Sequence, residues 1–274
     1  MKTSKSILLL TIVFCLTSLT AIGGERLAIP DGIYYHRFIS AVNGPEAIWI
    51  NPAGLGSYQN FTAQYMLEYF DGKLSKDWGF AVSGDKIGIG VRRLEDFLGS
   101  RLEEYSFAVG VPIMKTIYTG FSYQYIKDGP GEYNKKHLWN VGLLLKPNQR
   151  LSYGVVLTNL NRGRWEGEKT DFEQIYGISY TSPNNRLIFS VELSLSSGQN
   201  LSNAEYYYGL QFKVRPDLTI YGDLRSTDSF QIGLKWFFTN YFIGGQARFD
   251  DNRDHLGSTL YGGYKSPQSS PFGN

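Results

Sequence analysis

The chain has one cysteine, Cys15, among its 274 residues. Cys15 lies in an apolar N-terminal stretch that is predicted to be removed, so the mature chain has no thiol for disulfides or thiolate chemistry. Beyond that stretch no apolar run reaches the roughly 18 residues of a membrane helix. A membrane-embedded form would therefore have to be a closed barrel, because lipid leaves no backbone polar group unpaired. The net charge of +2 is too small to indicate a nucleic-acid partner.

Groups suited to catalysis are also few. The three histidines, His36, His137 and His255, are scattered, and no serine, histidine and acid share a spacing that suggests a catalytic set. The run from Asp250 to Asp254 opens like a calcium loop, but His255 stands where the loop needs glycine. We therefore predict no catalytic residue, no metal site and no cofactor, and we expect a protein that is not an enzyme.

The N-terminus is typical of a secretory signal peptide. Lys2 and Lys5 precede an apolar run around residues 7–16, and small residues follow at Ala21 and Gly23. This arrangement predicts a signal peptide over residues 1–23, with cleavage after Ala21 or Gly23.

From Phe61 to Tyr264 the chain alternates between apolar and small or polar residues in short segments. In one of them, Leu187, Phe189 and Val191 alternate with Ser190 and Glu192. A period of two indicates β-strands with one apolar and one polar face. Fourteen strands are predicted, over residues 61–70, 77–83, 86–94, 104–111, 116–126, 137–146, 150–158, 172–180, 186–195, 205–214, 218–225, 229–237, 241–249 and 255–264.

The connections between these segments are alternately longer and shorter, with one exception at residues 226–228. Long loops on one rim and tight turns on the other are typical of an outer-membrane β-barrel. We therefore predict an all-β fold, a closed antiparallel transmembrane barrel of 14 strands over residues 61–264, located in the outer membrane after signal cleavage. Residues 24–60 would form an N-terminal plug and residues 265–274 a C-terminal tail. A soluble β-sandwich is the alternative.

A motif precedes the first predicted strand. It consists of Ala47, Trp49, Asn51, Pro52, Ala53, Gly54 and Leu55. Asn51-Pro52 favours a turn, and Gly54 permits close approach to a barrel wall. The motif is either a corner that seats the plug or the border of a ligand path.

This motif resembles the N-terminal signature of the long-chain fatty-acid transporter (FadL) superfamily, closest to its PorV/PorQ-like branch. In that signature an alanine and an aromatic residue precede Asn-Pro-Ala-Gly-Leu. The resemblance implies an outer-membrane barrel with an N-terminal plug. It also implies contact with membrane lipid, and either hydrophobic small molecules or secretion-system and cargo proteins as partners.

Eight charged residues are predicted to point into the lumen by strand alternation. They are Glu68, Arg92, Glu192, Lys213, Asp223, Arg225, Lys235 and Arg248. A lipid-facing Arg or Lys at the bilayer centre would cost about 2–4 kcal/mol. These charges either pair to fasten the plug or line a selective route.

Three functions stay open at this point. The first is passage of apolar or amphipathic small molecules, as the resemblance to fatty-acid transporters implies. The second is a role in type IX secretion or surface assembly, which a resemblance to PorV/PorQ proteins implies. The third is a purely structural barrel.

Overall fold

The computed structural model describes residues 38–70, 73–95, 101–127, 135–161, 164–165, 168–169, 172–196, 199–226 and 229–267. The predicted signal peptide and the first part of the predicted plug, up to residue 37, lie outside these ranges. So does the end of the predicted tail, from residue 268. Among the residues described, no helix is long and apolar enough to cross a bilayer.

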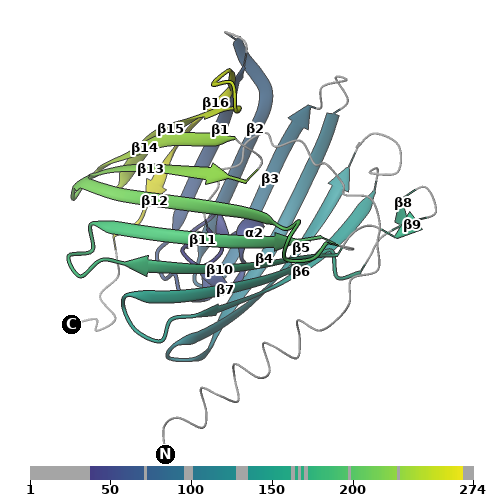
Figure 1. Cartoon of the computed structure of the whole chain (residues 1–274), viewed down its shortest axis with the longest axis horizontal. Helices are drawn as coiled ribbons and strands as arrows, with labels where there is room; N and C mark the ends of the chain where they lie inside the picture. The colour runs from purple at the N-terminus through teal and green to yellow at the C-terminus, as the bar shows by residue number, and fades with distance from the viewer. Residues whose placement is uncertain are drawn as a thin grey trace, which may run out of the picture.

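Fourteen strands close into one antiparallel barrel, which confirms the predicted fold class (Figure 1). Each wall strand pairs with the wall strands before and after it, β7 pairs with β10, and β16 returns to pair with β1. The wall strands are β1 (Thr62–Phe70), β2 (Lys73–Gly84), β3 (Ile87–Glu95), β4 (Arg101–Met114), β5 (Ile117–Lys127), β6 (Lys136–Leu145), β7 (Leu151–Thr158), β10 (Glu173–Thr181), β11 (Leu187–Leu195), β12 (Glu205–Arg215), β13 (Leu218–Arg225), β14 (Phe230–Phe238), β15 (Tyr241–Phe249) and β16 (His255–Lys265).

Two strands begin three or four residues earlier than the alternation predicts. β2 starts at Lys73 instead of residue 77, and β4 starts at Arg101 instead of residue 104. The added residues include Lys73, Lys76 and Arg101. These charged residues interrupt the apolar alternation in the sequence, although the backbone hydrogen bonds between the strands continue through them. A short hairpin of β8 (Arg164–Trp165) and β9 (Glu168–Lys169), which the sequence did not predict, lies in the connection between β7 and β10.

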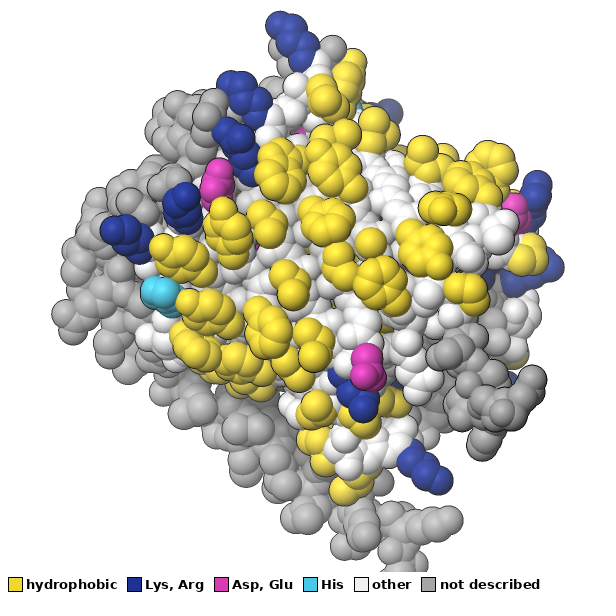
Figure 2. Space-filling view, turned by 180° about the vertical axis from the view of Figure 1, so that it is seen from behind, with side chains coloured by type: hydrophobic (Ala, Val, Ile, Leu, Met, Phe, Trp, Pro, Cys, Tyr) yellow, Lys and Arg dark blue, Asp and Glu magenta, His cyan; other side chains and the backbone are white. Residues whose placement is uncertain are grey.

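The outer face of the barrel is apolar. Large hydrophobic side chains point away from the lumen on strands around the wall, among them Ile89 at 58% exposure and Ile232 at 54%. Figure 2 shows them spread over one face of the barrel, with lysines and arginines mainly at its margins. This exterior is suited to lipid and not to water.

Aromatic rings gather where strands end. At the rim where β1 begins and β16 ends, which we call the terminal rim, Tyr241 packs against Tyr264 at 5.5 Å between ring centroids, and Trp236 against Phe238 at 5.2 Å. At the opposite rim Phe230 stacks on Phe249 at 5.0 Å. Rings at both ends of an apolar band are typical of membrane-spanning barrels.

Two short helices precede β1 and lie inside the barrel. They are α2 (Ala47–Ile50) and α3 (Ala53–Gly56), and they contact the inner faces of β3 to β6. Together with the preceding turn from Phe38 they form the part of the plug that the structure describes, residues 38–58, within the ring of strands (Figure 1).

Candidate functional site: the lumen and its plug

The corner between α2 and α3 is built around Asn51, which is fully buried. Its side-chain Oδ1 accepts a hydrogen bond from the Ala53 amide at 3.1 Å, which shapes the turn. Its Nδ2 donates to the carbonyl oxygen of Ile39 at 2.8 Å and to that of Leu143 on β6 at 3.3 Å. One amide side chain thus joins the start of the plug to its central corner and both to the wall.

The wall facing this corner is lined by glycine. Gly110, Gly120 and Gly142 are register partners on β4, β5 and β6. A Cβ on Gly120 would lie 2.2 Å from the carbonyl carbon of Pro52, and one on Gly142 would lie 2.0 Å from Asn51 Oδ1. The backbone of the plug therefore packs directly on the backbone of the barrel, which only glycine allows.

The glycine lining continues around the lumen beneath the rest of the plug. Cβ atoms on Gly88, Gly90, Gly154, Gly177 and Gly209 would each come within 3 Å of a plug residue. Gly90 faces the Trp49 ring, and Gly209 faces the Phe38 ring. Glycines on seven strands thus leave the space that the plug occupies.

Trp49 anchors α2 to a buried charged pair. Its indole Nε1 donates to Glu104 Oε1 at 2.8 Å and to Ser106 Oγ at 2.9 Å. Arg92 pairs with Glu104 and lies over the Trp49 ring, 4.8 Å from its centroid. Arg92 was among the predicted lumen charges, but Glu104 was not; the alternation of β4 places Glu104 on the same face as Ser106.

A further anchor lies at the terminal rim. Lys146, directly after β6, donates from Nζ to Ser57 Oγ at 3.1 Å and lies 5.7 Å from the Tyr118 ring centroid. Burial lowers the pKa of the Lys146 ammonium. The end of α3 is thereby tied to the wall next to β6.

The structure brings two of the predicted lumen charges together and gives others separate partners. Arg248 pairs with Glu68, and both are largely buried. Glu192 accepts the Ile39 amide of the plug, and Asp223 accepts from the side chain of Gln231.

The three remaining predicted charges lie toward the β12–β14 wall. Lys235 Nζ lies 4.0 Å from Glu46 Oε1 of the plug and 4.0 Å from the Phe242 ring centroid. Arg225 lies over the Tyr207 ring at 5.5 Å, and Lys213 is exposed near the terminal rim. Glu46, like Glu104, is a buried acid that sequence reasoning missed.

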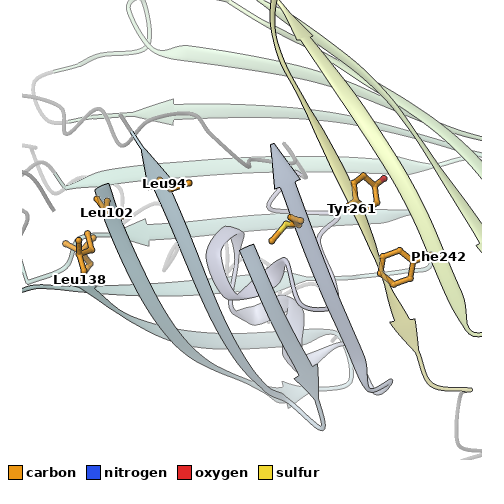
Figure 3. Packing of buried hydrophobic residues seen from close by; sticks show 7 residues of the cluster. Leu94, Leu102, Leu138, Phe242 and Tyr261 are labelled. Carbon is orange, nitrogen blue, oxygen red and sulfur yellow. The ribbon is translucent and has the colours of Figure 1, made fainter. Parts of the chain in front are cut away.

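An apolar strip also lines the lumen. Leu94, Leu102, Ile126 and Leu138, at the ends of β3 to β6 farthest from the terminal rim, are at most 5% exposed. They belong to one cluster with Met66, Phe242 and Tyr261, against which Trp49 and Phe237 pack. Figure 3 shows the labelled leucines and the two labelled rings on separate parts of the wall. Apolar side chains on this face depart from the polar interior usual in such barrels.

The described residues contain no group of three or more histidine, cysteine or acidic side chains that could hold a metal ion. The run from Asp250 to Asp254 closes a hairpin turn, in which the Asp254 amide donates to Asp250 Oδ1 at 2.7 Å. His137 lies beside Tyr123 and His255 beside Ser258, while His36 lies outside the described residues.

Comparison with known proteins gives structural neighbours only. The chain matches no known protein family, and no curated protein matches it. Among solved structures, it is similar to a mutant of the Rh. blastica porin with a TM-score of 0.44 and 8% identity, covering 76% of this chain and 99% of that one. A second mutant of the same porin gives a TM-score of 0.46 at 8% identity and the same coverage.

Proposed function

We propose that the protein is an outer-membrane barrel of the FadL-like type that passes hydrophobic or amphipathic small molecules. The observation that supports this best is the apolar strip inside the lumen. A lumen that only conducts water and polar solutes does not require buried leucines such as Leu94, Leu102 and Leu138. Leucines are stabilised by contact with other apolar groups. These leucines are covered in the structure, so an apolar solute that enters from the rim opposite the terminal rim would have to displace the residues packed on them.

The cluster that contains the apolar strip also includes residues near the terminal rim. Phe242 belongs to it, and Phe237 packs against it. Both rings line a cavity between the plug and the wall near the terminal rim. Apolar side chains of one cluster thus lie both at the ends of β3 to β6 farthest from the terminal rim and beside the cavity.

Uptake across an intact outer membrane tests this function, because lipopolysaccharide limits the entry of apolar probes. Cells that make the protein should take up N-phenylnaphthylamine, a neutral apolar dye, faster than cells with an empty vector. The double variant L102Q/L138Q places two amides in the strip and should slow uptake to the vector level. The matched variant L102M/L138M keeps the volume and polarity and should behave as the unaltered protein.

All variants should keep the heat-dependent gel mobility of a folded barrel, so that a folding defect is recognised. Equal uptake with and without the protein would refute passage of apolar molecules. Equal uptake by the two double variants would show that the strip plays no part in it.

A second candidate is a PorV/PorQ-like component of secretion or surface assembly, in which the barrel receives a partner protein. The fit of the plug to the glycine lining favours it, because plug backbone packed on β4, β5 and β7 and plug side chains packed on β3 and β6 close that side of the lumen. Cross-linking in intact envelopes followed by purification should then recover a stoichiometric protein partner. Recovery of the barrel alone would count against this candidate.

A further inference from the structure

The plug does not fill the barrel evenly. It packs closely on β3 to β7 and reaches β10 to β12 through residues 38–40 at its start. A cavity of about 260 Å³ lies between the plug and parts of β11 to β16 and β1. The lining includes Thr62 at the start of β1 and Lys265 at the end of β16. The cavity therefore lies at the terminal rim, whereas the leucines of the apolar strip lie at the opposite rim.

The charged lining of this cavity is mostly positive. Four cations, Arg186, Lys213, Lys235 and Lys265, and two carboxylates, Glu46 and Asp223, line it, which leaves two positive charges in excess. Glu46 Oε1 lies 4.0 Å from Lys235 Nζ, and Asp223 accepts from Gln231. Both acids are thus engaged deep in the cavity, while the excess charge lies toward its mouth.

Arg186 and Lys213 supply that charge. They stand side by side, since the Lys213 amide donates to the Arg186 carbonyl oxygen at 2.8 Å. Both are exposed, and within the described parts of the chain neither makes an ion pair. Two adjacent cations at the mouth of a low-dielectric cavity create a positive potential that attracts an anion.

Aromatic rings also line the cavity. Tyr221, Phe237 and Phe242 belong to its lining and are buried or half-buried, whereas Arg186 and Lys213 are exposed. Exposed cations beside less exposed aromatic rings are complementary to an anionic group carried on a small apolar body.

We infer that this cavity is a binding site for a carboxylate that approaches from the terminal rim, with Arg186 and Lys213 as the groups that hold it. The carboxylate belongs either to a small organic acid or to the C-terminus of a polypeptide. This site goes beyond the proposed function, since it requires no passage through the barrel.

Fluorine NMR of 4-fluorobenzoate, added to the mature protein in nanodiscs, tests the site. Saturable broadening of the fluorine signal is expected with the carboxylate, and at least about tenfold weaker binding with neutral 4-fluorobenzyl alcohol. The variant R186Q/K213Q should weaken carboxylate binding by about tenfold or more. The matched variant K115Q/R150Q removes two exposed cations from turns of the same rim outside the cavity, and it should leave binding unchanged.

Competition then identifies the source of the carboxylate. Displacement of the probe by a tripeptide acid and not by its amide assigns the site to a polypeptide terminus, and displacement by benzoate alone assigns it to a small acid. The inference is overturned if 4-fluorobenzoate does not saturate, if the neutral alcohol binds equally well, or if the two variants lose binding equally. Because dye uptake is not measured, these results are independent of the test of the proposed function.

Discussion

The glycine lining makes a quantitative prediction about how firmly the plug is seated. In the variant Gly120→Ala, the new Cβ would lie 2.2 Å from the Pro52 carbonyl carbon and 2.3 Å from the Ala53 nitrogen, whereas ordinary contact begins at 3.4 Å. The difference between 2.2 and 3.4 Å means that the plug must move by about 1.2 Å. Both atoms belong to the backbone, so no side chain can rotate away.

Overpacking of this kind costs about 1–3 kcal/mol. If the strain is relieved by release of the plug, the ratio of seated to released plug falls by roughly 5- to 150-fold. The barrel wall should be unaffected, because its ladder of backbone hydrogen bonds does not involve the Cβ position.

Hydrogen exchange measured by mass spectrometry separates the two parts. Peptides from residues 38–58 should exchange faster by that factor in Gly120→Ala, while peptides from β10 to β16 keep their protection. Gly222→Ala on β13 is the matched control, since its Cβ would meet a single atom at 3.2 Å. Unchanged plug exchange in Gly120→Ala, or the same increase in Gly222→Ala, would refute the account of the glycine lining.

Three further predictions concern polar contacts. Trp49→Phe removes the indole donor and should speed exchange of the plug about tenfold; exchange equal to that of the unaltered protein would contradict the anchor. Arg248→Met leaves Glu68 buried without this partner and should cost about 3–5 kcal/mol of stability in urea unfolding, with partial recovery when Glu68→Gln is added. At the terminal rim, the hydrogen bond from the Trp236 indole is the main cause that lowers the pKa of Asp217. Trp236→Phe should raise the pKa of Asp217 in an NMR titration. Because the pKa of Asp217 is lower in the folded than in the unfolded protein, its carboxylate stabilises the fold at higher pH, and this contribution is lost as the pH falls through the pKa of the folded state.

Alternation along the chain was sufficient to predict the barrel, because the lumen and the lipid impose opposite polarity on successive residues. It was less informative at strand ends, where Lys73 and Arg101 continue the ladder beyond the apolar band. The Asn51 motif could be singled out because Asn-Pro has a local turn preference. The partners of Trp49 could not, since Glu104 lies 55 positions away and only the closed barrel brings the two together.

The same limit applies to the lumen itself. The sequence indicated many glycines but not which of them meet the plug, because that depends on the register of β4, β5 and β6. The leucines of the apolar strip lie on the face that alternation predicts to be polar, so they could be placed only once the wall had closed.

The position of the plug along the chain has a consequence for how the molecule is assembled. The plug runs directly into β1, and Tyr58 is hydrogen-bonded to Thr62 at 2.7 Å, so the connection between them is short. β1 is also the strand with which β16 pairs to close the wall. The short connection therefore holds the plug next to this seam, so that the strand that closes the barrel also carries the segment that fills it.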